Sequence, residues 1–209
     1  MTDIHPDHFE MRRLESLSNT IFGVAMTLLA YDLPKAGDFK NLPGWTDPAG
    51  ELTKSLPDWT DLYHLYAGRL SGLILSFIIA GLFWFSHHRR LARHPHGRRI
   101  DVILNLFFLL SIILLPVTNG LNGSYRLSGP VAVLYGLHLT VIAGLNAWLW
   151  WLATRDGRPH PELLPAVFPF LVFLPCTAIA VFAPQYVQYF WFLAFGALLM
   201  RRRFGGQRA

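Results

Sequence analysis

A cluster of polar side chains stands at the beginning of a long apolar stretch that covers residues 14–34. Arg13, Glu15, Ser16, Ser18 and Asn19 precede an almost uninterrupted apolar run. Polar groups at the entrance of a membrane span are costly and are therefore kept where they serve a function. The chemistry open to these groups is hydrogen bonding or ion pairing with a neighbouring helix at this end of the span.

Four histidines, His87, His88, His94 and His96, follow the second apolar stretch. Imidazole rings titrate near neutral pH and bind transition metals, so a pH sensor or a metal site could be built from them. Metal sites usually need histidines at helical spacing with supporting carboxylates, and the nearest acid here is Asp101. The pattern therefore predicts no metal site.

A second pattern lies deeper in the first apolar stretch. Val24, Leu28 and Tyr31 follow the i, i+4, i+7 spacing of one helix face, and Thr27 borders that stripe. Gly23 is small enough to let a neighbouring helix approach closely. The stripe could line a narrow pore with hydrophobic rings or form a buried packing seam, and periodicity alone leaves both interpretations open.

Composition indicates the fold class. The chain has 209 residues, of which 53% are hydrophobic and only 15% charged, and a helix crosses a bilayer with about 20 apolar residues. We therefore expect an all-α membrane protein with six transmembrane helices in a single domain, residues 1–209. The predicted spans are residues 14–34, 65–87, 100–119, 130–153, 162–183 and 185–201.

The positive charges of the chain are distributed unevenly. Thirteen of its eighteen basic residues lie before the first span, after the second, after the fourth or after the sixth, which places them on one side of the membrane. This is the positive-inside pattern, so both termini should be cytoplasmic. The net charge of +5 thus orients the protein, and we expect no binding of nucleic acid.

The later spans offer no catalytic group. The interiors of these spans contain no carboxylate, and the single cysteine, Cys176, excludes an intramolecular disulfide. Asn105, His138 and Asn146 are polar exceptions, for which interhelical hydrogen bonds are the expected role. The sequence predicts no enzyme, no cofactor and no bound metal.

Two motifs resemble those of a known family. Arg13-x-x-x-Leu17-Ser18-Asn19 resembles the Arg-x-x-x-Phe-Ser-Asp signature that opens the first helix in the lysosomal potassium channel family, the transmembrane protein 175 type, and in its bacterial homologues. The segment GLFWFSHHRR, residues 81–90, is similar to the aromatic and histidine motif that ends the second helix there. Leucine replaces phenylalanine and asparagine replaces aspartate in the first motif.

The resemblance implies a homotetramer in a prokaryotic plasma membrane, with helix 1 of each subunit lining a central pore. It implies permeation of potassium ions over sodium and contact with membrane lipid. Val24 matches the main hydrophobic constriction, and Thr27, Leu28 and Tyr31 match the next pore-facing layers. The chain contains no Thr-Val-Gly-Tyr-Gly-like loop, so a carbonyl selectivity filter is not expected.

The resemblance also implies a polar network between helices 1 and 2. Trp84 and either His87 or His88 would bond to Ser18 or Asn19, with Arg13 at the entrance.

The alternative function is a secondary transporter whose polar site is formed by Arg13, Asn19 and His87. Transporters of that kind usually carry broken helices in corresponding halves, and that pairing is not found in the sequence.

Overall fold

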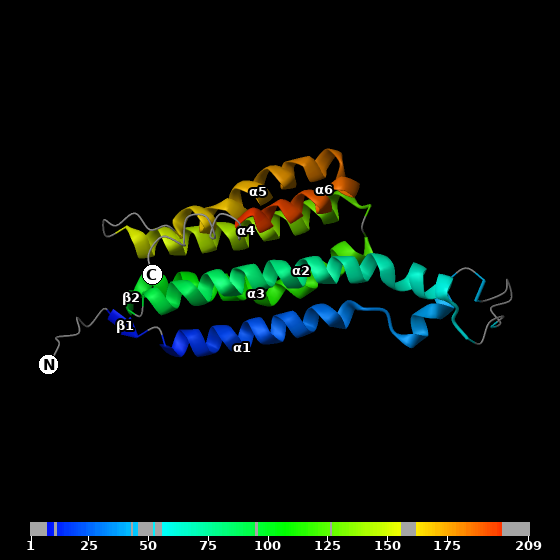
Figure 1. Cartoon of the computed structure of the whole chain (residues 1–209), viewed down its shortest axis with the longest axis horizontal. Coiled ribbons are helices and arrows are strands. Elements are labelled where there is room, and N and C mark those ends of the chain that lie inside the picture. The colour runs from blue at the N-terminus through cyan, green and yellow to red at the C-terminus, as the bar shows by residue number, and fades with distance from the viewer. Residues whose placement is uncertain are drawn as a thin grey trace.

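The structure is a computed structural model that describes residues 8–10, 12–42, 44–45, 52, 56–94, 96–125, 127–155 and 162–197. Long helices lie side by side along one axis and form an elongated bundle (Figure 1). The described elements are β1 (His8–Glu10), α1 (Arg12–Leu29), η1 (Ala30–Asp32), η2 (Ala36–Asn41), α2 (Trp59–Arg93), β2 (His96–Arg98), α3 (Arg99–Ser124), α4 (Gly129–Thr154), α5 (Leu163–Phe182), α6 (Pro184–Trp191) and η3 (Phe192–Phe195).

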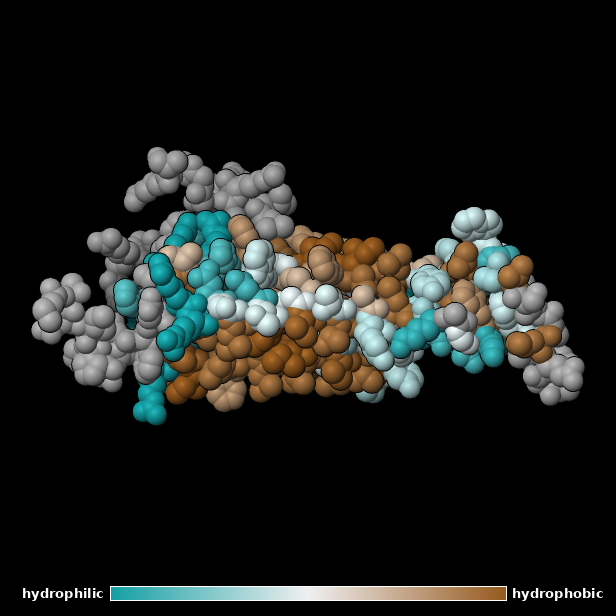
Figure 2. Space-filling model, turned by 90° about the horizontal axis from the view of Figure 1, so that it is seen from below, coloured by the Kyte–Doolittle hydropathy of each residue, from teal (hydrophilic) through white to brown (hydrophobic). Residues whose placement is uncertain are grey.

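Four of these helices, α2 to α5, are long and apolar enough to cross a membrane by length and composition. The shortest, α5, has 20 residues, which matches the thickness of a bilayer core. Apolar side chains cover the middle of the molecule, with hydrophilic side chains toward both ends (Figure 2). The chain is therefore an α-helical membrane protein, apart from the short antiparallel pair of β1 and β2.

The first and last predicted spans differ from these four. α1 has 18 residues and begins with Arg12, Arg13 and Glu15, and α6 has 8 residues before the chain continues as η3. Neither belongs to the helices that qualify as spans within the described residues. The six-span topology and its boundaries stay a prediction, and part of the last predicted span lies outside the described residues.

α4 and α5 approach each other closely in the second part of the chain. A Cβ atom added to Gly136 would lie 2.7 Å from the Thr177 hydroxyl oxygen, so the contact requires glycine at this position. Asn146 Nδ2 donates to the Ala166 carbonyl at 3.3 Å, and Cys176 is a buried free thiol. Small residues and single hydrogen bonds of this kind join helices where lipid offers no hydrophobic driving force.

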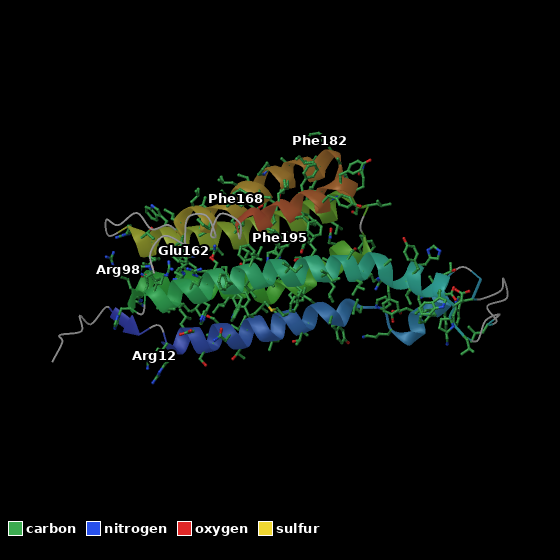
Figure 3. The ribbon with its side chains drawn as sticks, in the orientation of Figure 1. Arg12, Arg98, Glu162, Phe168, Phe182 and Phe195 are labelled. Atoms are coloured by element: carbon green, nitrogen blue, oxygen red, sulfur yellow. The ribbon has the colours of Figure 1, made fainter. Side chains whose placement is uncertain are left out.

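Most of the described arginines lie at one end of the bundle, which we call the arginine-rich end. α1, α3 and α5 begin there, and α2 and α4 end there (Figure 1). The carboxylate of Glu162 is buried and forms ion pairs with Arg89 and with Arg93. These pairs connect the end of α2 to the start of α5; Figure 3 labels Arg98 and Glu162 at this end.

Candidate pore-lining helix and the polar cluster behind it

α1 has two chemically different sides. Its buried residues recur at the spacing of one helix face and pack against α2 and α3. The buried residues are Leu14, Ser18, Phe22, Ala25 and Leu29.

The opposite side, which we call the outward face of α1, is not covered by the other described residues of the chain. All four residues predicted to line a pore lie on it: Val24 is 53% exposed, Leu28 46% and Tyr31 69%, and Thr27 is also exposed. A rotation of about 100° per residue places Thr27 opposite the buried residues, whereas Leu28 lies nearer the edge. The outward face consists of Ser16, Leu17, Thr20, Gly23, Val24, Thr27 and Leu28 of α1, together with Tyr31 of η1, which follows α1 directly.

Small and hydroxyl-bearing residues form a row along this face. Ser16, Thr20, Gly23 and Thr27 follow the i, i+4, i+7, i+11 spacing. Pale, weakly polar residues run between apolar areas when the molecule is viewed from the α1 side (Figure 2). Sequence reasoning selected the neighbouring apolar stripe and missed Ser16 and Thr20, although their helical spacing was the available signal.

The hydroxyl of Thr27 is oriented by its own helix. Its Oγ1 donates to the carbonyls of Gly23, at 3.0 Å, and Val24, at 2.7 Å. Because the proton points back to the backbone, the oxygen lone pairs remain available on the outward face. An oxygen in this state can contact a partly dehydrated cation.

A polar cluster lies behind α1, where it meets α2 and α3. His87 of α2 is only 2% exposed, and its Nε2 lies 2.9 Å from Ser18 Oγ of α1. Its ring lies between Phe22 and Phe108, with centroid distances of 6.1 and 5.1 Å. The side chains of Ser18, His87, Arg90 and Asn105 form what we call the polar cluster.

Arg90 determines the direction of the hydrogen bonds in this cluster. Its guanidinium can only donate, and Nη2 lies 3.3 Å from Nδ1 of His87. Nδ1 therefore accepts, the ring proton resides on Nε2, and Nε2–H donates to Ser18 Oγ. Ser18 in turn donates to the Leu14 carbonyl at 2.6 Å, so a one-way chain of hydrogen bonds joins α2 to α1.

Arg90 also connects the cluster to α3. It is buried and donates to the side-chain carbonyl of Asn105. Asn105 Nδ2 donates to the Asp101 carbonyl at 2.6 Å. Sequence reasoning counted Arg90 only as an orienting charge and missed this role; its place one turn after His87 was the available signal.

The other predicted members of the network make separate contacts. Trp84 Nε1 donates to Asn19 Oδ1 at 2.9 Å, and His88 Nδ1 lies 3.1 Å from Glu15 Oε1. Arg13 is exposed at the start of α1. The structure thus brings Ser18 to His87 and Asn19 to Trp84, and it does not bring Arg13, Asn19 and His87 into one site.

The remaining histidines of the run do not gather around a common point. His94 follows the last residue of α2, and His96 pairs with Glu10 in the β1–β2 ladder. Within the part of the chain that the structure describes, no group of three or more His, Cys, Asp or Glu side chains could hold a metal ion.

The apolar bundle, the outward face of α1 and the buried polar cluster together define a polytopic membrane protein with a specialised first helix. The family model described as the endosomal/lysosomal potassium channel TMEM175 matches residues 13–116. A protein of Streptomyces collinus named as a potassium channel is 29% identical over 155 residues, which cover 71% of this chain and 67% of that protein. No solved structure matches the chain. Over residues 13–116 the chain is therefore similar to the TMEM175 potassium channel family.

The matched region coincides with the features described above. Residues 13–116 contain the outward face of α1 and every member of the polar cluster. α4 to α6 lie beyond the match to the family model.

Proposed function

We propose that four copies of this chain assemble into a cation channel that conducts potassium better than sodium, with the outward faces of α1 around a central pore. The uncovered outward face of α1 carries this proposal. The family, and the Streptomyces relative named as a potassium channel, support it. Potassium is then the permeant ion, and no resident cofactor or metal takes part.

The composition of the outward face favours a protein-lined pore over lipid contact. α3 exposes long aliphatic and aromatic side chains such as Ile103, Phe107 and Leu114, which suit lipid. α1 instead exposes a row of serine, glycine and threonine, and such small residues are typical of close helix approach. Four copies of this face would bury surface that a single subunit leaves open.

Apolar side chains and hydroxyl-bearing side chains have different roles in such a pore. Rings of Val24 and Leu28 form an apolar neck, which loses water when narrow and conducts when it widens enough to stay hydrated. The oxygen of Thr27 replaces part of the water that a cation sheds there. Because potassium sheds water more easily than the smaller sodium ion, we expect modest selectivity without a carbonyl filter. Tyr31 lies at the far end of the neck.

The polar cluster fixes the position of this neck relative to the scaffold. Ser18 is on the opposite side of α1 from Val24, and the hydrogen bonds through His87 and Arg90 hold it against α2 and α3. A shift of α1 would break this chain of bonds, so the cluster is expected to bias gating. The arginine-rich end would face the cytoplasm of a prokaryotic cell, with both termini on that side.

Single-channel recording of the full chain in planar bilayers tests the proposal. Unitary currents carried by potassium, with a smaller conductance in sodium, are expected. Flux without unitary steps would instead favour the secondary transporter with its site at Arg13, Asn19 and His87. Crosslinking in mild detergent should stop at four subunits, and a monomer that retains transport would contradict the assembly.

A further inference from the structure

A cavity of about 120 Å³ lies at the arginine-rich end, between the end of α2, the start of α3 and the end of α4. Its volume is several times what one water molecule needs. The cavity lies apart from the outward face of α1. The lining residues are Arg90, His94, His96, Gly97, Arg98, Ile100, Asp101, Leu152, Ala153 and Arg155.

The charge of this lining is strongly positive. Among the described residues that line the cavity, Arg90, Arg98 and Arg155 are cationic and Asp101 is the one carboxylate. Asp101 Oδ2 accepts from the backbone N–H of Arg98 at 2.8 Å, and three guanidinium groups against one carboxylate leave an excess of positive charge in the lining. The nearby Arg89 and Arg93 both form ion pairs with the single buried carboxylate of Glu162.

Two further observations point to a bound anion. The guanidinium of Arg90 is buried, and its Nε–H finds no hydrogen-bond acceptor among the residues that the structure describes. A buried donor without a partner is costly, and an anion in the cavity would remove that cost. The cavity also lies at the first turn of α3, whose positive dipole end favours negative charge.

The opposite dipole end of α4 also reaches the cavity, but its last carbonyls are partly used. Thr154 Oγ1 donates to the carbonyls of Trp150 at 3.0 Å and Trp151 at 3.2 Å. Three arginines outweigh the partial negative charge that remains there.

We propose that this cavity binds a phosphate group, from the headgroup of an anionic phospholipid or from free inorganic phosphate. Arginine is suited to this task because its planar donors pair with phosphate oxygens. The ends of three membrane helices meet here, at the level where lipid headgroups lie, and basic pockets between such helices are typical sites for these headgroups. Trp148 and Trp151 are exposed near this end of α4, and exposed tryptophans are typical of the membrane–water interface, where lipid headgroups lie.

The test measures the melting temperature of the purified full chain in detergent while phosphatidylglycerol is added. Phosphatidylcholine, which carries no net charge, is the lipid control, and inorganic phosphate is tested in a third series. A saturable rise with phosphatidylglycerol alone would assign a lipid site, and an equal rise with inorganic phosphate would assign a free-phosphate site.

The matched variants are Arg155→Gln and Arg98→Gln in the cavity and Arg99→Gln beside it, since Arg99 is exposed and does not line the cavity. Each cavity variant should weaken the apparent affinity about fivefold, and Arg99→Gln should match the unmodified chain. No rise with either anion, or equal rises in all three variants, would overturn the proposal. The readout needs no ion flux, so its failure is distinct from failure of the channel function.

Discussion

Polar side chains inside the bundle are hydrogen-bonded differently among the first three helices and among the last three. Two histidines, His87 and His138, show this difference. His87 belongs to a chain of hydrogen bonds that joins α1, α2 and α3. His138 of α4 satisfies both ring nitrogens on α3 alone, with Thr118 Oγ1 at 2.7 Å and the Ser111 carbonyl at 3.0 Å. The first arrangement positions a helix with an uncovered face, and the second fastens one scaffold helix to another.

The largest difference is expected when each histidine is removed. His87→Ala opens a space between Phe22 and Phe108 and takes one partner from Arg90 and one from Ser18. This should cost about 3 kcal/mol per chain and disturb both the stability and the gating of the proposed tetramer. His138→Ala should cost about 1 kcal/mol and leave the flux of potassium unchanged. Thermal melting, size-exclusion profiles and liposome flux would measure both; equal effects on flux would remove the distinction between the two regions.

Two valines test the surfaces of the two regions. Val24 on α1 is 53% exposed and Val141 on α4 is 51% exposed, so the two side chains are about equally accessible in a single chain. If Val24 faces water in the open pore, Val24→Cys should react with a membrane-impermeant thiol reagent, and Val141→Cys should stay unreactive in lipid. Both variants need a Cys176→Ser background.

Polar substitution at the same two positions gives a functional readout. Val24→Asn should hydrate the apolar ring and raise basal potassium leak several-fold, since gating by water loss requires an apolar surface. Val141→Asn should leave leak unchanged. Normal expression with unchanged flux for Val24→Asn would place Val24 against protein or lipid.

Asn19 tests a second contact between α1 and α2, separate from the polar cluster. Its Oδ1 accepts from Trp84 Nε1, so Asn19→Ala leaves the indole donor without that acceptor and should cost about 1 kcal/mol per subunit. Asn19→Asp keeps an acceptor and makes it anionic, which strengthens such a bond; melting temperature and flux should be preserved. If Asn19→Ala leaves both quantities unchanged, the contact is only interfacial.

The sequence predicted those features that depend on the spacing of residues along one helix or on one family motif. The stripe of Val24, Leu28 and Tyr31 was readable because helical periodicity predicts which residues share a face. The partners Ser18 and His87 were readable only through the family motif.

Contacts between helices that are distant in the sequence could not be predicted from spacing or from the motif. Nothing in the sequence shows that α3 turns Asn105 toward Arg90, because that depends on how two helices pack. The predicted second span begins at residue 65, whereas the helix that contains it, α2, begins at Trp59, because Asp58 accepts from the Asp61 backbone N–H at 2.9 Å and caps the helix there. That capping pattern was present in the sequence, whereas the position of Asn105 required the fold.

The smallest expected effect concerns a polar residue of the scaffold. Asn146 makes one interhelical hydrogen bond, to the Ala166 carbonyl at 3.3 Å, and that length is close to the upper limit for such bonds. Single hydrogen bonds between membrane helices contribute about 0.6 kcal/mol, so Asn146→Ala should lower the melting temperature only slightly. Its potassium flux should equal that of the unmodified chain, because α4 and α5 remain joined at Gly136 and Thr177. A loss of flux in this variant, without a loss of stability, would show that coupling to the pore extends into the second half of the bundle.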